Sequence, residues 1–346
     1  MKKFQIPIIA LIFASLIFLT ACGKTEAKKA EVKKVDEFAE MMKYMEENGD
    51  FINRSKKEGG APTMVKAPEL LKNIDNYHII DIRGAKDFAA GHIKGSVNKK
   101  LKDLIPYFES IDTKKYKKIV LVCYSGQSGG FATSALRLIG YDNVYDLKWG
   151  MASWNKKFAK KWTSNIGNKF SDKIETATNP KAAKGAYPVI KTGKKTGKEI
   201  TYERAKILFA NGFSPVKVKV DKLFKSPEKY YIVNYWPEKK YLAGHVPTAI
   251  NYLPKKTLKR TTDLSTLPTD KPIVVYCYTG QHSAFITAYL RMLGYDARSL
   301  LFGANSFMNK KMVDKKWHGF SDKDIHDYAF ETSEMVGNGE EDEEGC

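Results

Sequence analysis

Long apolar segments are absent from this chain, and acidic residues are outnumbered by basic ones. The longest apolar run, from Ile6 to Leu19, is shorter than the about 20 residues that a transmembrane helix needs, and no later segment is long enough. The sequence therefore predicts no membrane-spanning helix. The 346 residues include 58 Lys and Arg against 39 Asp and Glu, which gives a formal net charge of +19.

The N-terminus has the pattern of an export signal. A basic start, Met1-Lys2-Lys3, precedes the apolar run, and the small residues that follow end at Cys22. A cysteine in this place resembles the lipidation site of a bacterial lipoprotein, which carries a diacylglycerol. We expect residues 1–21 to be cleaved and Cys22 to be acylated, so that the lipid anchors the protein to the membrane. A plain secretory signal or a buried core segment is the alternative.

The residue after Cys22 bears on location. Gly23 is not the acidic residue of an inner-membrane retention signal. The expected location is therefore the cell envelope, at the outer membrane facing the periplasm or the surface if the cell is Gram-negative.

An exported chain seldom meets nucleic acid, and the lysines are scattered in pairs. The positive charge therefore favours an anionic membrane surface and an anionic substrate or partner, and no nucleic acid.

The chain contains one internal repeat, which includes two of its four cysteines. Cys123 and Cys277 lie 154 residues apart in matching contexts. Matching contexts argue for a repeated function, since disulfide partners need not resemble each other. Cys346 is expected to be a thiol on an acidic tail. The matching segments are 91–98 with 244–251, 120–128 with 274–282, 136–142 with 290–296, 160–162 with 315–317, and 170–173 with 320–323.

Each copy alternates short apolar runs with helical patterns, which predicts an α/β fold with a doubly wound, mostly parallel sheet flanked by helices. In the first copy the predicted elements are strands 77–82, 119–122 and 144–147 and helices 85–90 and 127–139. The predicted organisation is a signal peptide (1–21), a lipidated tether (22–35), domain 1 (36–178), a linker (179–198), domain 2 (199–330) and an acidic disordered tail (331–346).

Each cysteine lies where a buried strand ends and a glycine-containing turn leads into a helix. This places the sulfur at the carboxyl edge of a parallel sheet, where ligands bind in open α/β folds. Backbone N–H groups of the turn and the helix N-terminus favour a thiolate and any anion attached to it. The pattern predicts a nucleophilic cysteine in an anion cradle, although a lone cysteine at a strand end is more often a core residue.

Both copies resemble rhodanese domains, which are sulfurtransferases. The resemblance rests on Asp81-Ile82-Arg83, on the segment from Gly91 to Asn98, on the two Cys-x-x-Gly loops, on Gly140-Tyr141 and on Trp149-Gly150-Met151. It implies about five parallel strands per domain, a persulfide formed on Cys277 and Cys123, and no cofactor or metal. Asp81 and Arg83 are expected to support the loop. The expected substrate-binding loops consist of Tyr124, Ser125, Gly126, Gln127, Ser128, Tyr278, Thr279, Gly280, Gln281, His282 and Ser283.

The two copies depart from the family pattern in different ways. The first has Gly129 where the family often has serine, and the second has Ser283 there but Asn234-Tyr235-Trp236 in place of Asp-x-Arg. Cys277 is therefore slightly preferred as the active residue. His282 is expected to add positive charge near Cys277. Neither loop contains the arginine that clamps an oxyanion in the phosphatase and arsenate-reductase relatives, which disfavours phosphate ester chemistry.

The leading hypothesis is an extracytoplasmic sulfurtransferase. It takes sulfane sulfur from thiosulfate, a polysulfide or a similar donor and passes it to an anionic or thiol acceptor, with an exported redox protein as a further partner. The alternative is a membrane-tethered protein that binds sulfur or selenium, or acts as a scaffold, for a respiratory or stress system without turnover. A reductase role for the chain would require a resolving thiol, for which Cys346 is the candidate.

Overall fold

The computed structural model describes Met1 and residues 35–334. The predicted signal peptide, Cys22, the tether up to residue 34 and residues 335–346 of the predicted tail lie outside the described residues, so those predictions stay untested. Among residues 35–334, no helix is both long and apolar enough to cross a bilayer.

The first repeat forms a five-stranded sheet in which all pairings are parallel, in the order β1-β5-β4-β2-β3. Its strands are β1 (Met64–Val65), β2 (Tyr77–Asp81), β3 (Val97–Asn98), β4 (Lys118–Val122) and β5 (Val144–Leu147). Its helices are α2 (Ala67–Lys72), α3 (Ala85–Ala90), α4 (Leu104–Ser110), α5 (Gln127–Leu138), α6 (Met151–Trp154) and α7 (Lys160–Thr163).

The second repeat forms an equivalent sheet, in the order β6-β10-β9-β7-β8, again with every pairing parallel. Its strands are β6 (Lys217–Val218), β7 (Tyr231–Asn234), β8 (Ile250–Asn251), β9 (Ile273–Tyr276) and β10 (Ala297–Leu300). Its helices are α9 (Val220–Lys225), α10 (Glu238–Tyr241), α11 (Gln281–Met292) and α12 (Asn305–Asp314). The predicted α/β fold with about five parallel strands per copy is confirmed.

The central strands are apolar because both of their faces are covered. All four residues of β9 are buried, as are the last four of β4, which is the burial expected of parallel strands between two helical layers. Every residue of α5 is also buried, since α5 packs on its own sheet with one side and on α11 with the other. The contact between α5 and α11 therefore joins the two domains.

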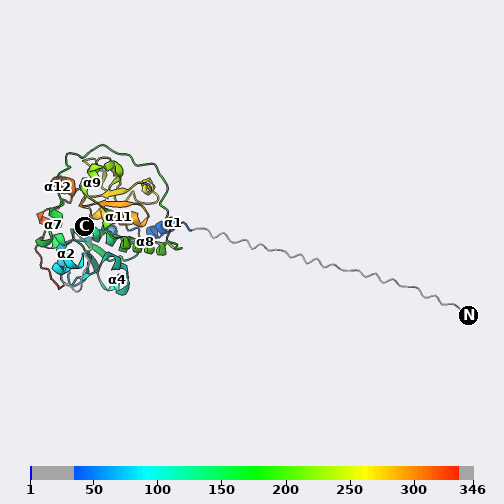
Figure 1. The fold of residues 1–346 in the computed structure, drawn as a ribbon, viewed down its shortest axis with the longest axis horizontal. Helices are drawn as coiled ribbons and strands as arrows, with labels where there is room; N and C mark the ends of the chain where they lie inside the picture. The colour runs from blue at the N-terminus through cyan, green and yellow to red at the C-terminus, as the bar shows by residue number, and fades with distance from the viewer. Residues whose placement is uncertain (2–34, 335–346) are drawn as a thin grey trace. The chain divides into compact units, whose positions relative to one another are not determined.

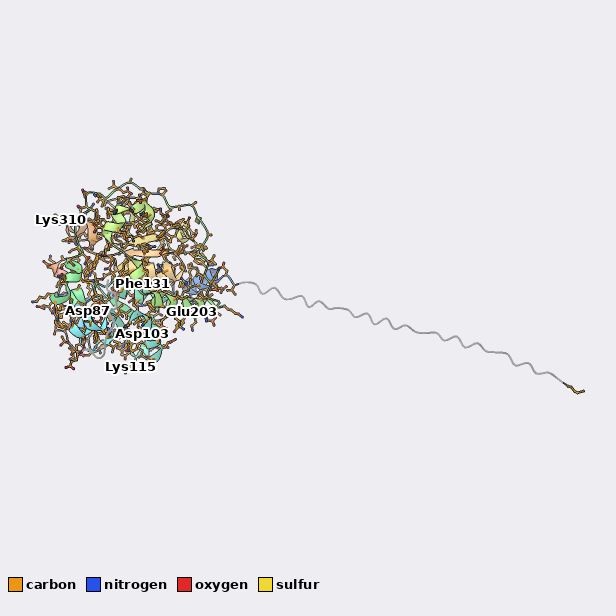
Figure 2. All side chains as sticks on the ribbon, viewed as in Figure 1. Asp87, Asp103, Lys115, Phe131, Glu203 and Lys310 are labelled. Carbon is orange, nitrogen blue, oxygen red and sulfur yellow. The ribbon has the colours of Figure 1, made fainter. Side chains whose placement is uncertain are left out.

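Side chains from the two domains meet along α5 and α11. Figure 1 shows α2 and α4 on one side of α11, and α9 and α12 on the other. Phe131 of α5, labelled in Figure 2, belongs to the same buried apolar cluster as Phe285 of α11. The Ser134 hydroxyl donates a hydrogen bond to the Phe285 carbonyl oxygen (2.8 Å).

Two helices outside the repeats reinforce this junction. The N-terminal helix α1 (Glu37–Glu47) packs on α8 (Gly197–Asn211), which also contacts α5 and α11. Thr196 and Glu199 form a capping box that starts α8 within the last residues of the predicted linker. The Glu37 carboxylate accepts hydrogen bonds from Thr192 and Gly193, so this part of the linker lies against α1.

Each domain also sends a segment onto the other. Glu175 pairs its backbone with His245 of domain 2, although the sequence placed it in domain 1. Residues 325–331 run along domain 1, where Asp327 bridges to Asn155 and Glu331 to His92. The predicted tail starts at Glu331, but this residue is held in place by backbone hydrogen bonds to His92 in both directions (2.9 Å each).

Candidate active site: two cysteine loops

The first cysteine loop wraps its backbone around the sulfur of Cys123. The loop leaves β4 at Val122 and enters α5 at Gln127, with Gly126 at a φ of 81°. The backbone N–H groups of Gly126 and Gly129 donate to Cys123 Sγ at 3.1 and 3.3 Å. Donors aimed at one atom form a cradle for a negative charge on that atom.

The second loop repeats this arrangement around Cys277. Gly280 has a φ of 76°, α11 begins at Gln281, and the Ser283 N–H donates to Cys277 Sγ at 3.3 Å. Neither Cys123 nor Cys277 forms a disulfide, and each is 1% exposed. The predicted strand–cysteine–turn–helix geometry is present in both domains.

A glycine in the turn after β5, and another in the turn after β10, packs against the backbone of each cysteine loop. A Cβ atom on Gly150 would lie 2.4 Å from the Cys123 carbonyl oxygen, and one on Gly303 would lie 2.4 Å from that of Cys277. The next residues donate to the same carbonyls, Met151 at 2.8 Å and Ala304 at 3.0 Å. Gly303 was not singled out from the sequence, although alignment of Phe302-Gly303 with Trp149-Gly150 would have indicated it.

The two loops interlock through a pair of glutamines. The Gln127 side-chain oxygen accepts a hydrogen bond from the Phe302 N–H (2.8 Å), and Gln281 Nε2 donates to the Ser125 carbonyl oxygen (3.1 Å). Both glutamines are fully buried. A Cβ atom on Gly126 would lie 2.0 Å from Gln281, and one on Gly280 would lie 2.3 Å from Gln127. The two glutamines therefore link the loops to each other, a role that the sequence did not indicate.

The entrance to the first loop is polar and charged. Arg83 pairs with Asp81 (2.6 Å) and also donates to the Gly91 carbonyl oxygen (2.6 Å), and both partners of the ion pair are buried. The Tyr124 hydroxyl donates to Asp87, which Figure 2 labels. Burial and Asp87 both raise the pKa of Tyr124, so its hydroxyl stays protonated. Asp81 and Arg83 thus tie the end of β2 to the C-terminal end of α3.

The entrance to the second loop is aromatic. Trp236, which replaces Arg83, is fully buried and stacks on Tyr278 with 4.9 Å between ring centroids. Asn234, which replaces Asp81, donates from its side chain to the Tyr276 hydroxyl (2.8 Å). The loss of the ion pair is therefore compensated by packing and neutral hydrogen bonds.

His282 corrects one expectation. Burial, together with the positive charges of Lys255 and Lys56, lowers the pKa of His282 to about 3. The ring is neutral at pH 7 and adds no positive charge near Cys277, contrary to the prediction. The two lysines that act on His282 lie outside the loop, and Lys56 belongs to the other domain. Its own burial and the positive charge of Arg54 lower the pKa of Lys255 to about 8.

The other predicted loop residues differ in burial. Ser125, Ser128 and Thr279 are buried, whereas Tyr124 and Tyr278 are partly exposed. His92 and His245 each direct Nδ1 to a carbonyl four residues earlier, at 2.9 and 2.8 Å, as a packing turn requires. In the part of the chain that the structure describes, no three His, Cys, Asp or Glu side chains gather as a metal site.

Comparisons with known proteins agree with this geometry. The family model described as "Rhodanese-like domain" matches residues 66–157 and 219–310, more than half of the chain. A curated relative, the thiosulfate sulfurtransferase GlpE of Shewanella oneidensis, is 35% identical over 78 residues, which cover 22% of this chain and 75% of the relative.

Other relatives are less similar in sequence and differ in how much of their length is matched. The adenylyltransferase and sulfurtransferase uba4 of Ogataea parapolymorpha is 26% identical over 80 residues, which cover 23% of this chain and only 20% of the relative. Among solved structures, a rhodanese-related protein from Thermoplasma volcanium is 26% identical over 27% of this chain and 89% of its own, with a TM-score of 0.25. A thiosulfate sulfurtransferase from Pseudomonas aeruginosa is 13% identical over 85% of this chain and 49% of its own, with a TM-score of 0.27. TM-scores this low add nothing to the family assignment.

Proposed function

Because this chain belongs to the rhodanese family and contains two of its domains, we propose that it is a sulfurtransferase of the cell envelope that forms persulfides on Cys277 and Cys123. The observation that carries the proposal is the backbone N–H groups that donate to the sulfurs, those of Gly126 and Gly129 to Cys123 and that of Ser283 to Cys277. A negative charge on a buried sulfur needs such donors.

The chemistry needs no oxidant, reductant or cofactor. The cysteine thiolate attacks the sulfane sulfur of a donor such as thiosulfate. A new S–S bond forms as the donor's S–S bond breaks, and sulfite leaves with the bonding electron pair. A nucleophilic acceptor then attacks the outer sulfur of the persulfide, and the cysteine leaves as the thiolate.

The charges around Cys277 favour an anionic donor, either thiosulfate or a polysulfide. Lys56 and Lys255 both act on His282, which follows the loop glycine by two residues. Their positive charge attracts an anion and stabilises the persulfide anion once it has formed. We infer that Lys56, and with it domain 1, contributes to this attraction.

The proposed location rests on the N-terminal sequence. The basic start, the apolar run and Cys22 support a lipid anchor. We infer attachment to the outer membrane if the cell is Gram-negative. An exported thiol or redox protein is the proposed acceptor, since the positively charged chain suits an anionic partner.

Burial of both sulfurs favours a second candidate function. Each cysteine is 1% exposed and its loop is locked to the other. A protein that stores sulfur or selenium for a partner would hold its cysteines in this way and would not turn over alone.

One experiment tests both candidates. Protein comprising residues 23–346 is incubated with thiosulfate or a polysulfide, its intact mass is measured, and cyanide is then added. A mass gain of one sulfur that cyanide removes, with repeated release of thiocyanate, is the expected result for the enzyme. Cys277→Ser and Cys123→Ser show which cysteine takes up the sulfur. Sulfur gain without turnover favours storage, and no gain on alkylatable thiols contradicts both.

A further inference from the structure

The loops around the two sulfurs have the same backbone conformation, but the side chains next to the two sulfurs differ. Asp146 pairs in register with Leu121, two residues before Cys123, and Ser299 pairs with Val275, two residues before Cys277. Asp146 and Ser299 are therefore equivalent positions. Gly129 and Ser283 are also equivalent, since each follows its cysteine by six residues.

In domain 1 a carboxylate fills the space next to the sulfur. A Cβ atom on Gly129 would lie 2.2 Å from Asp146 Oδ1 and 3.5 Å from Cys123 Sγ. The carboxylate oxygen and the sulfur therefore both lie close to the point where a Gly129 side chain would begin. Asp146 is fully buried, so Gly129 is required here because any side chain would collide with the carboxylate.

In domain 2 the same space holds two hydroxyl groups. Ser283 and Ser299 are fully buried, and their Oγ atoms lie 2.9 Å apart. The Ser283 hydroxyl also donates to the Gly280 carbonyl oxygen (3.0 Å). The residue pair next to Cys277 is therefore neutral and hydrogen-bonded, whereas the pair next to Cys123 includes an acid.

A buried thiol and a buried carboxyl group at one site do not both ionise readily, because like charges repel strongly where water is excluded. An isolated cysteine loses its proton near pH 8.5 and an isolated aspartic acid near pH 3.9, both approximate values. The aspartic acid therefore loses its proton first, so that the charge is on Asp146 and the sulfur keeps its proton.

We propose that Asp146 is a positioning residue that keeps Cys123 in the thiol form at neutral pH, so that Cys277 is the readily formed nucleophile. This assignment of roles rests on the proposed sulfurtransferase function. The backbone N–H donors around Cys123 therefore stabilise a thiolate only after Asp146 has taken up a proton or at higher pH.

The other charged groups near the two loops are common to every variant in the test. Near Cys123 they are the Asp81–Arg83 pair, the Tyr124–Asp87 pair, Lys148, which follows Asp146 by two residues, and Lys161, whose Nζ lies 5.0 Å from the centre of the Tyr124 ring. Near Cys277 they are His282 and Tyr278, with the lysines and the histidine that act on them or lie near them: Lys56, Lys148, Lys240, Lys255 and His318.

The test is the pH profile of alkylation, read for each cysteine by peptide mass spectrometry in the full chain. Iodoacetamide is the probe, from pH 5 to pH 10. In the wild type we expect a higher midpoint for Cys123 than for Cys277. Asp146→Asn should lower the midpoint of Cys123 by one pH unit or more, which is about tenfold faster alkylation at pH 7. The midpoint of Cys277 should not move.

A reciprocal exchange provides the matched control. The double variant Gly129→Ser/Asp146→Ser installs the domain 2 pair in domain 1 and should lower the Cys123 midpoint. Ser283→Gly/Ser299→Asp installs the acid in domain 2 and should raise the Cys277 midpoint, which decides the matter if the domain 1 variants do not fold. An unchanged or raised Cys123 midpoint in folded Asp146→Asn overturns the proposal. Alkylation requires no sulfur donor, so this outcome is separate from any failure of sulfur transfer.

Discussion

The two domains have the same backbone but differ in where they bury charge. Domain 1 has a buried ion pair, Asp81 with Arg83, and a buried acid, Asp146. Domain 2 has Asn234, Trp236 and Ser299 at the same three positions. Sheet order, strand register and loop geometry are nonetheless equal, so these charges are not what determines the fold. They determine the chemical environment of each sulfur, which is where the two copies have diverged.

The largest expected effect comes from breaking the ion pair of domain 1. Arg83→Met leaves the Asp81 carboxylate buried without its partner, and we expect a loss of about 3–5 kcal/mol in the free energy of unfolding. Urea unfolding of the full chain measures it. The double variant Asp81→Asn/Arg83→Met removes both charges, as domain 2 does, and should lose clearly less. An equal loss in the single and double variants would contradict the comparison.

Smaller losses in the free energy of unfolding are expected for the two glutamines that link the loops, and the two losses should differ. Gln127→Ala removes the acceptor of the buried Phe302 N–H, and we expect a loss of about 1–3 kcal/mol. Gln281→Ala should lose about 0.5–1.5 kcal/mol, because the Ser125 carbonyl oxygen keeps its hydrogen bond from Trp162 Nε1 (3.1 Å). The same unfolding measurement ranks them. A larger loss for Gln281→Ala than for Gln127→Ala would contradict this ranking.

The smallest expected effect is a pH dependence confined to domain 2. The folded state lowers the pKa of His282 to about 3, so the unfolded chain binds a proton more readily below about pH 6.5. Stability is therefore lost as the pH falls from about 6.5 towards 3, by about 1.4 kcal/mol between pH 7.5 and 5.5. His282→Ser installs the residue found at this position in domain 1, Ser128. It should flatten this part of the stability profile, measured by urea unfolding at each pH. An unchanged slope would mean that the histidine is protonated in the folded protein.

Much of the fold could be read from the sequence because it depends on local patterns. The apolar runs that form β2, β4 and β5 begin and end within a residue of their predicted bounds, and α5 begins at Gln127 as predicted. Short apolar runs between helical patterns allow few arrangements other than a covered parallel sheet. The cysteine loops could be located for the same reason, since strand, turn and helix are adjacent in the chain.

The features that were missed depend on residues far apart in the sequence. The sequence placed Glu175 in domain 1 and Glu331 in a disordered tail, whereas their backbone partners are His245 and His92. His282 was expected to be charged because a sequence does not show which lysines a ring will face or how deeply it will be buried.

By itself the sequence determined the repeat, the parallel sheets and the positions of Cys123 and Cys277, because periodicity and loop spacing act over a few residues. Only the tertiary structure decided that the loops interlock through Gln127 and Gln281, and that Cys123 has the acid Asp146 beside its loop where Cys277 has the neutral pair Ser283 and Ser299. Those contacts join positions on different strands and domains, and burial makes a single charge there decisive for the ionisation of its neighbour.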